Sequence, residues 1–339
     1  MKTIVLRNPG DFYITETEAP GPPAENEALV RVRRIGICGT DLHAYRGRQP
    51  FFTYPRILGH ELGIEIIQVG PNEPGLRPGD HCALEPGLYC GECIACRRGR
   101  TNCCRHLKLL GVHVDGGMQE LIKVPITHLH RSEKLDLEQL ALVETLSIGC
   151  HAIDRARPEP NEPTLVIGLG PIGLTVVQFA KLAGSDVVVM DTNEKRLDFC
   201  REVLGIKKTL VAGQPRLLDA LQTACGGDLP TLVLDATGNP KCMTDAFNLV
   251  ACSGRLVLVG LVQEQIAFDD PEFHRREITL LASRNSRPKD FDRIIELLEQ
   301  KKIDTTPWIT HRSSFADMID QFKIWLDPDS GTIKPIVEI

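Results

Sequence analysis

The spacing of hydrophobic and polar positions changes character near residue 163. Before that point, short apolar runs rich in β-branched residues are interrupted by Gly and Pro, as in "ALVRVRRIGICG" at 28–39, "LGIEIIQVG" at 62–70, "RPGDHCALEP" at 77–86 and "MQELIKVP" at 118–125. Such punctuation is typical of short antiparallel strands joined by turns. We therefore predict an irregular, mostly β domain for the first part of the chain.

From about residue 163 the pattern becomes strand, turn and helix in repetition. Apolar runs at 164–168, 186–191, 231–238, 255–260 and 278–283 predict strands, and helical stretches follow the first three. Alternating strands and helices predict a parallel sheet covered on both faces. A helix over 291–303 and a strand over 334–339 follow, and we expect that strand to return to the first domain. The predicted fold class is α/β, with domains at 1–150 and 151–283 and a C-terminal segment at 284–339.

Composition narrows the function. A chain of 339 residues favours more than one domain. Its net charge of −6 argues against a nucleic-acid partner, since such proteins usually carry a basic surface. No apolar run is long enough for a signal peptide or a membrane span, so we expect a cytoplasmic protein without a membrane partner. Twelve cysteines are many for that compartment, so clustered ones are better interpreted as metal ligands than as disulfides.

The segment "TLVIGLGPIGL" predicts a dinucleotide site. Gly168, Gly170 and Gly173 form a G-x-G-x-x-G array between a strand and a helix, with Pro171 and Ile172 inside it. The first two glycines permit a tight turn close to a pyrophosphate, and the third lets the helix pack on the strand. Asp191 ends the next strand, where a carboxylate can bind the ribose hydroxyls and repel a 2′-phosphate. NAD is therefore favoured over NADP, although Arg196 nearby leaves NADP open.

The segment "CGECIACRRGRTNCC" predicts a structural zinc site. It supplies Cys90, Cys93, Cys96 and Cys104, with Cys103 as a spare thiol. Four thiolates satisfy tetrahedral zinc and leave no position for a substrate. A nucleic-acid-binding zinc ribbon is an alternative, because arginines lie between the cysteines. The usual ribbon has two C-x-x-C pairs about 15 to 20 residues apart, which this loop lacks.

A second metal site is predicted from separated segments. Cys38 in "GICGTDLH", His60 and Glu61 in "GHE", and Glu144 in "VETLSIGCHA" offer a thiolate, an imidazole and two carboxylates. Catalytic zinc takes such mixed ligands when one position stays open for water or substrate. Each residue alone also fits an ordinary structural role, and their spacing does not decide between the two interpretations.

Taken together, these motifs and "DGGMQE" resemble the zinc-dependent medium-chain dehydrogenases, the family of alcohol, sorbitol and threonine dehydrogenases, over essentially the whole chain. The resemblance implies a GroES-like catalytic domain and a Rossmann domain. It also implies that Cys38, His60 and either Glu61 or Glu144 hold the catalytic zinc. Thr40 and His43 match the positions that lead the alcohol proton to solvent, while its hydride passes to NAD.

Several stretches, among them "PFFTYPRILGHE" and "DPEFHRREITLLASRN", resemble the sugar-acid dehydrogenases that oxidise the C5 hydroxyl of L-galactonate or L-gulonate. Such a substrate carries a carboxylate, for which Arg284 is the first candidate partner and Asn285, Arg56 and His113 are weaker ones. A neutral polyol such as sorbitol is the main alternative, and L-threonine is another. The resemblance implies a homodimer or homotetramer. A zinc-free relative without alcohol chemistry, such as a quinone reductase, would lack "GHE" and the four-cysteine loop.

Overall fold

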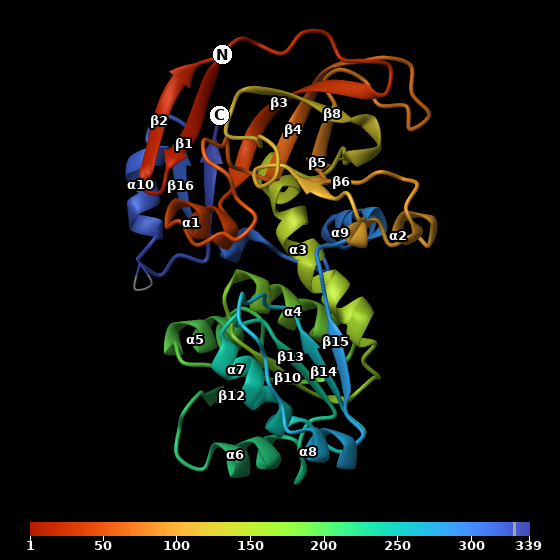
Figure 1. Ribbon diagram of the computed structural model, residues 1–339, viewed down its shortest axis with the longest axis vertical. Helices are drawn as coiled ribbons and strands as arrows, with labels where there is room; N and C mark the ends of the chain where they lie inside the picture. The colour runs from red at the N-terminus through yellow and green to blue at the C-terminus, as the bar shows by residue number, and fades with distance from the viewer. Residues whose placement is uncertain (328–329) are drawn as a thin grey trace. The chain divides into compact units, whose positions relative to one another are not determined.

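Two compact units make up the protein (Figure 1). The computed structural model describes residues 1–327 and 330–339. One unit combines residues 1–145 with 287–339, and the other spans 146–286. The long helix α3 (Leu137–Ala156) begins in the first and ends in the second. Each unit has its own set of buried apolar side chains, so we describe each by itself.

The unit of residues 146–286 is built on a parallel sheet of six strands in the order β12, β11, β10, β13, β14, β15. Their bounds are β10 (Pro163–Ile167), β11 (Asp186–Asp191), β12 (Lys208–Val211), β13 (Leu232–Asp235), β14 (Arg255–Leu258) and β15 (Thr279–Ala282). The central strands β10, β11 and β13 are almost entirely buried, as expected for a sheet covered on both faces. The chain order reverses between β10 and β13, and ligands bind beside such a switch point, at the carboxyl ends of the strands.

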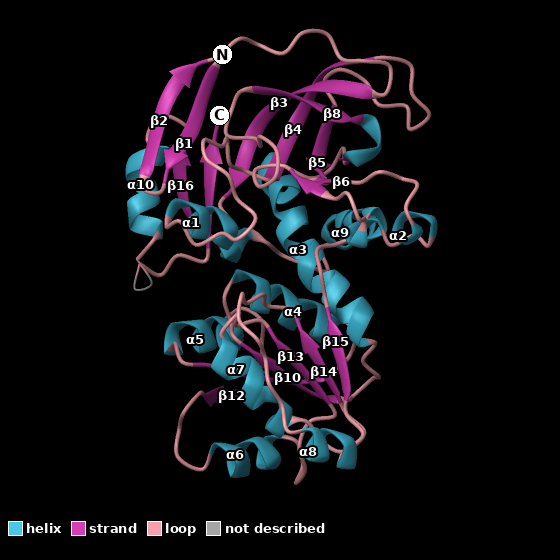
Figure 2. Cartoon of the chain, in the orientation of Figure 1, coloured by secondary structure: helices cyan, strands magenta, loops and turns pink. Residues whose placement is uncertain are grey.

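Short helices connect these strands (Figure 2). They are α4 (Pro171–Leu182), α5 (Glu194–Glu202), α6 (Leu217–Ala224), α7 (Pro240–Asp245) and α8 (Asp270–Arg275). The sequence pattern predicted α4, α5 and α7 as helices, whereas β12 and α6, which lie between α5 and β13, were not predicted. The expected helix across Met243 to Ala251 is split, because α7 passes into a 3-10 turn at Ala246–Leu249.

The other unit contains a sheet with the strand order β16, β17, β3, β4, β5, β9, in which β8 also pairs with β3. The strands are β3 (Glu27–Gly36), β4 (Glu61–Val69), β5 (His81–Leu84), β8 (Leu121–Pro125), β9 (Leu129–Arg131), β16 (Ile309–Ser314) and β17 (Lys334–Glu338). All pairs except β16 with β17 are antiparallel. The C-terminal strand β17 pairs directly with β3, as the sequence predicted.

Smaller elements complete this unit. They are the hairpin of β1 (Lys2–Asn8) and β2 (Asp11–Glu16), the pair of β6 (Gly87–Leu88) and β7 (Lys108–Leu109), and the helices α1 (Gly39–Tyr45), α2 (Ile94–Arg97), α9 (Pro288–Glu299) and α10 (Met318–Trp325). The helix α1 contains the last five residues of "GICGTDLH". Cys38 is its N-cap residue, so the thiol stands where a strand turns into a helix.

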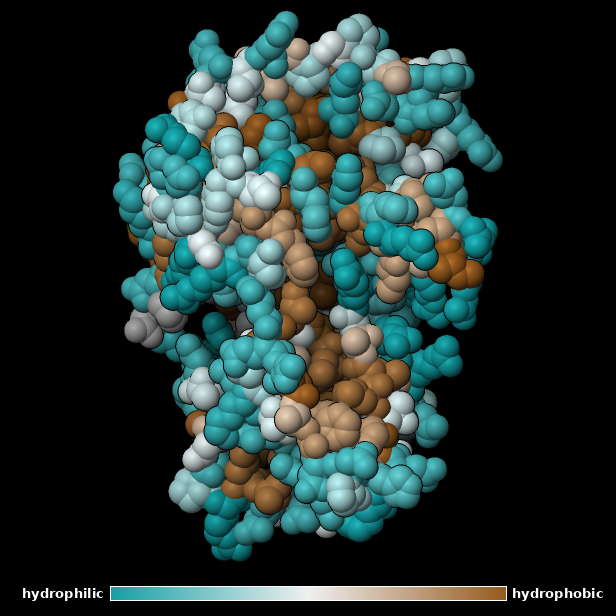
Figure 3. All heavy atoms as spheres, viewed as in Figure 1, coloured by the Kyte–Doolittle hydropathy of each residue, from teal (hydrophilic) through white to brown (hydrophobic). Residues whose placement is uncertain are grey.

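The viewed face carries mostly hydrophilic side chains, with apolar ones between them (Figure 3). Among the residues that the structure describes, no helix is both long and apolar enough to cross a membrane.

Candidate active site

The glycine array forms a cradle at the carboxyl end of β10. Gly168 has a φ of 84°, which favours glycine. A Cβ on Gly173 would lie 1.7 Å from the carbonyl oxygen of Gly168, so only glycine lets α4 start this close. A Cβ on Gly170 would meet no atom within 4 Å, so the space beside the helix N-terminus is open. Because α4 begins at Pro171 with its amide groups pointing to that space, the cradle fits a pyrophosphate.

Asp191 stands at the end of β11 and shapes the same cradle. One carboxylate oxygen accepts from the backbone N–H of Leu169 at 2.6 Å, and the other accepts from the N–H of Asn193 at 2.8 Å. The guanidinium of Arg196, which lies on α5, is 3.7 Å from a carboxylate oxygen of Asp191. A carboxylate has about four lone pairs, so Asp191 keeps capacity for ribose hydroxyls after these two bonds.

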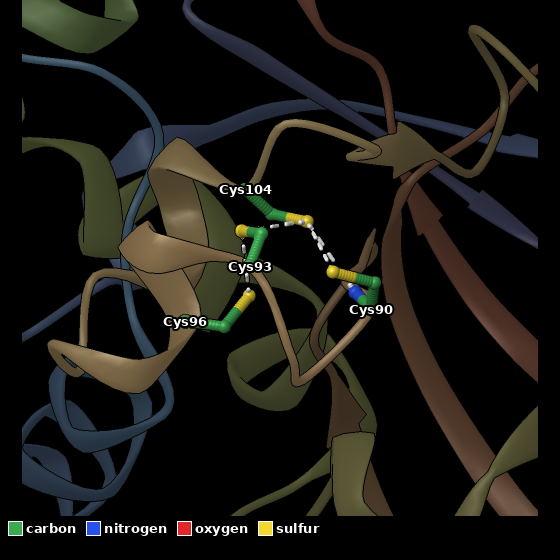
Figure 4. Close-up of side chains that lie close together, drawn as sticks. All are labelled: Cys90, Cys93, Cys96 and Cys104. Carbon is green, nitrogen blue, oxygen red and sulfur yellow. Dashed lines mark hydrogen bonds between the residues drawn. The ribbon is translucent and has the colours of Figure 1, made fainter.

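The four predicted cysteines come together in one lobe. Figure 4 shows the thiol groups of Cys90, Cys93, Cys96 and Cys104 turned toward one another. The sulfur of Cys93 lies 3.6 Å from that of Cys96 and 3.9 Å from that of Cys104, which lies 3.5 Å from that of Cys90. Tetrahedral thiolates around zinc lie about 3.8 Å apart, given Zn–S bonds of about 2.3 Å. The lobe therefore fits a zinc ion that has four protein ligands.

Backbone N–H groups donate hydrogen bonds to sulfur atoms in this lobe. The N–H groups of Cys90 and His106 both donate to the sulfur of Cys104 at 3.3 Å. Hydrogen bonds from the backbone of Arg105 and Cys96 lower the pKa of Cys93 to about 6. Since thiolates are the form that binds metal, these bonds favour the ligand state of Cys93, whereas burial and the neighbouring thiols raise the pKa of Cys96 to about 12.

The second predicted site is largely buried, with Cys38 half-buried. A thiol from Cys38, an imidazole nitrogen of His60 and a carboxylate oxygen of Glu61 lie within 4.8 Å of one another. His60 is 7% exposed and Glu61 is fully buried. The segments meet because β3, which leads to Cys38, pairs with β4, which begins at Glu61. Long-range strand pairing therefore assembles these ligands.

Glu144 lies on α3 and belongs to the same electrostatic environment. Burial raises the pKa of Glu144 to about 7, opposed by the nearby His60. Gly63 has a packing role beside it, because a Cβ there would lie 2.2 Å from the carbonyl oxygen of Leu137 on α3. Gly63 thus lets the helix that carries Glu144 approach β4.

Two further residues of this site escaped the sequence analysis. Asp41 is fully buried, accepts a hydrogen bond from the N–H of Cys38 at 2.9 Å, and has its other oxygen 3.8 Å from Nδ1 of His60. Lys334, on β17, donates to both oxygens of Glu61. Burial alone would lower the pKa of Lys334, but Glu61 and Cys38 raise it above its ordinary value. The signal for Asp41 was its place three residues after Cys38; nothing nearby in sequence pointed to Lys334.

The site carries more acidic groups than its cations balance. Cys38, Asp41, Glu61 and Glu144 are potential anions, whereas Lys334 and His60 are the neighbouring bases. The buried oxygen Oδ1 of Asp41 and nitrogen Nδ1 of His60 have no hydrogen-bond partner. Buried charge without compensation is costly, so a divalent cation with this mixed set of ligands fits the site.

Thr40 and His43 lie on α1, directly after Cys38. Three residues apart on a helix, they share one face, and His43 is exposed whereas Thr40 is half-buried. Partial burial, helped by Arg46 and Arg48, lowers the pKa of His43. A neutral imidazole at the surface can accept a proton.

The four candidate substrate residues differ in their surroundings. Arg56 donates to Asp115 at 3.2 Å and to Thr53 at 2.8 Å, so its guanidinium already has two hydrogen-bond acceptors. His113 accepts from the N–H of Leu109 and stacks on Phe51. Arg284 and Asn285 follow β15 in the other unit. Arg284 is exposed, and the side-chain nitrogen of Asn285 is buried without a hydrogen-bond partner.

Comparisons with known proteins agree with this geometry. The model of the alcohol dehydrogenase GroES-like domain matches residues 24–134, and that of the zinc-binding dehydrogenases matches residues 171–300. The chain belongs to the zinc-binding alcohol dehydrogenases, enzymes that act on CH–OH groups. It is 40% identical to L-galactonate-5-dehydrogenase of Escherichia coli K12, over 95% of this chain and 94% of the relative. It is 32% identical to 2-dehydro-3-deoxy-L-galactonate 5-dehydrogenase of Pseudoalteromonas atlantica, over 96% and 95%.

A solved structure extends the likeness to the fold. The dehydrogenase RspB of Escherichia coli CFT073, complexed with NADH, superposes with a TM-score of 0.93 at 32% identity, covering 100% of this chain and 99% of that one. The predicted fold class, a Rossmann sheet with a GroES-like domain, is confirmed. The family assignment and the predicted zinc and nicotinamide cofactors are confirmed as well.

Proposed function

We propose that this enzyme oxidises the C5 hydroxyl of a sugar acid of the L-galactonate or L-gulonate type to a ketone, with NAD as the hydride acceptor. The observation that carries the proposal is the 40% identity to an L-galactonate-5-dehydrogenase across nearly the full length of both chains. The second relative is likewise named for the 5-position of a galactonate skeleton.

The protein's own side chains divide the work between binding and proton movement. Zinc, when bound by the mixed-ligand site, acts as a Lewis acid on the hydroxyl oxygen of the alcohol. Thr40 and His43 carry the released proton to solvent, for which the lowered pKa of His43 is suited. The cradle around Gly170 binds the NAD pyrophosphate, and Asp191 binds the ribose and disfavours a 2′-phosphate.

Recognition of a sugar acid requires a cation for its carboxylate. Arg284 is the candidate that best suits this role, because its guanidinium can form a paired hydrogen bond with a carboxylate. Arg56, which donates to Asp115 and Thr53, is a weaker candidate from the sequence. Asn285 and His113 would contribute hydrogen bonds and not charge.

The test measures NADH formation by zinc-loaded enzyme on L-galactonate, L-gulonate, the corresponding alditols and L-threonine. We expect higher kcat/KM for the acids. Arg284→Met should lower the acid-to-alditol ratio by about 10- to 100-fold, the loss of one charge-assisted hydrogen bond of roughly 1.5–3 kcal/mol. Arg275→Met is a matched control, since Arg275 pairs with Glu272 on the surface of the same unit.

Equal or faster turnover of the alditols by the wild type would contradict the sugar-acid assignment and favour a polyol dehydrogenase. Turnover of threonine alone would favour an amino-acid alcohol. A fall in activity on acids and alditols alike in Arg284→Met would remove Arg284 from carboxylate recognition.

We also propose that the enzyme is a homodimer or homotetramer in the cytoplasm. β15 ends the described sheet of its unit, and Leu280 on this strand is 39% exposed, so the edge offers a surface to a second copy. All twelve cysteines are free, which suits a reducing compartment. Light scattering on the purified protein tests the assembly, and a monomer at micromolar concentration would contradict it.

A further inference from the structure

His130, on β9, lies between two carboxylates in the unit of residues 1–145 and 287–339. Its Nδ1 is 2.7 Å from a carboxylate oxygen of Asp292 on α9, and its Nε2 is 3.9 Å from Oε2 of Glu85, which directly follows β5. The imidazole also stacks on the ring of Phe291, with the ring centroids 4.8 Å apart. One side chain of the sheet therefore contacts α9 both through a charge and through a ring.

The two carboxylates differ in their access to water. The side chain of Glu85 is 5% exposed, whereas that of Asp292 is 65% exposed. Within the described part of the chain, Oε2 of Glu85 and Nε2 of His130 are buried and have no hydrogen-bond partner. A buried carboxylate oxygen without a donor is costly, so Glu85 needs an N–H of His130. Water can solvate Asp292 if His130 does not.

The number of N–H groups on the imidazole decides which carboxylate it can serve. Protonated His130 has two N–H groups, one for each carboxylate, whereas neutral His130 has one N–H and one lone pair. The single N–H is needed most by the buried Glu85. The lone pair then stands at Nδ1, where it repels the oxygen of Asp292. Loss of the proton therefore breaks the link to α9 and keeps the link to Glu85.

His128, in the turn before β9, is the third titratable group that faces His130. Both ring nitrogens of His128 have hydrogen-bond partners of their own, and burial lowers its pKa. Burial also lowers the pKa of His130, but Asp292 and Glu85 raise it above its ordinary value. Of the two histidines, His130 is therefore the one that carries a charge near neutral pH and loses it on the alkaline side.

The far end of α9 has a second attachment of a different kind. The carboxylate of Glu299 accepts from the hydroxyl of Ser132 at 2.7 Å and from the ammonium of Lys134 at 3.0 Å. These two bonds lower the pKa of Glu299. A carboxylate and an ammonium both keep their charges between neutral and mildly alkaline pH. The helix thus has one attachment that responds to pH in this range and one that does not.

We propose that Glu85, His130 and Asp292 form a pH-sensitive latch that fastens the first half of α9 to β9. Protonated His130 holds both carboxylates and closes the latch, and neutral His130 releases Asp292. Because α9 begins the C-terminal segment of this unit, which continues to β17, the latch controls how firmly that segment starts on the sheet. This device is independent of the proposed alcohol oxidation.

The test is hydrogen–deuterium exchange on the full chain, with protection factors that correct for the intrinsic effect of pH on exchange. As pH rises above the ordinary imidazole pKa of about 6.5, protection of the amides at 292–295 should fall about 10-fold, for the loss of one charge-assisted hydrogen bond. The amides at 296–299, beside the Glu299 attachment, should keep their protection. No fall at 292–295, or an equal fall in both halves of α9, would overturn the proposal.

Two variants and a control complete the test. Asp292→Ala removes the exposed half of the latch, so protection at 292–295 should stay at the alkaline level of the wild type at every pH. His130→Gln cannot change its charge and should likewise show no step. His274→Gln changes an exposed histidine of α8 and should keep the wild-type step.

A step of wild-type size in Asp292→Ala or in His130→Gln would overturn the proposal. If His130→Gln does not fold, Asp292→Ala decides alone, because its side chain is mostly in solvent and its removal leaves the buried atoms in place.

Discussion

The two metal sites of this protein are built in opposite ways. The four-cysteine lobe takes all its ligands from one short segment, Cys90 to Cys104, and its sulfur atoms are 3.5–3.9 Å apart along the chain of contacts. The mixed-ligand site draws residues from the turn between β3 and α1, from α1, from the start of β4, from α3 and from β17. All of them are buried except Cys38, which is half-buried, and the site includes more carboxylates than a metal with an open position can use. The first is complete by its own local geometry, whereas the second depends on neighbours that hold or restrain its ligands.

This difference explains why one site suits structure and the other chemistry. Four identical ligands around zinc leave nothing to exchange, so the ion contributes to folding alone. A site with competing carboxylates keeps an open position only if its surroundings restrain one of them. In this site Lys334 donates to both oxygens of Glu61, and Asp41 lies beside His60.

The largest expected effect on activity is that of removing one ligand from the mixed-ligand site. Cys38→Ser should lower kcat/KM by about a thousandfold, since Lewis-acid stabilisation contributes several kcal/mol. The zinc content should fall from about two ions per chain to about one, with little change in the circular dichroism spectrum. Steady-state kinetics and metal analysis on one sample measure both, and retained activity would contradict the assignment of the site.

The corresponding change in the lobe should act on stability. Cys96→Ser removes one of the four thiolates and should lower the melting temperature by about 10 °C, because a structural zinc contributes several kcal/mol of folding energy. Cys103→Ser is the matched control, since Cys103 is the exposed neighbour of Cys104. Equal melting temperatures for both variants would mean that the lobe holds no structural ion.

A smaller effect should follow from removing the charge of Asp41, which faces His60. Asp41→Asn keeps an oxygen that caps α1 but removes the charge facing Nδ1 of His60. Changes of this kind around a metal ligand lower metal affinity by about 10- to 100-fold. Competition with a chelator measures the affinity. An unchanged value would mean that Asp41 serves only as a helix cap.

The smallest expected effect is a pH dependence of stability from His130, which contacts the C-terminal segment. His130 donates from Nδ1 to a carboxylate oxygen of Asp292 on α9 at 2.7 Å, and its Nε2 lies 3.9 Å from Glu85, with His128 nearby. Burial alone lowers the pKa of His130, but Asp292 and Glu85 raise it above its ordinary value. The stabilisation is therefore complete below the unfolded pKa of about 6.5 and is lost as pH rises through the higher folded pKa.

Thermal melts across this pH range should show a decline of a few degrees in the wild type that His130→Gln abolishes. The same decline in both proteins would assign the pH dependence to other groups.

Predictability from sequence followed the same division between local and long-range features. The cysteine lobe and the glycine cradle could be predicted because their ligands or glycines lie within a few residues and their spacing reflects the geometry directly. The mixed-ligand site was predicted from the family resemblance, and its spacing alone did not decide the matter. Lys334 was missed because it is nearly three hundred residues from Glu61, and only the pairing of β17 with β3 brings the two together.

The long helix α3 was missed for a related reason. Half of it lies in each unit and most of its side chains are buried, so it presents no clear alternation of apolar and polar positions.

The most direct test of the account is a chelator time course in which zinc release, NADH formation on L-galactonate and circular dichroism are followed together. We expect two steps. One zinc per chain leaves first, from the site with an open position, and activity disappears with it while the fold remains; the second leaves with loss of structure. Activity that survives the first release, or both ions leaving together as the protein unfolds, would contradict the claim that the two sites do different work.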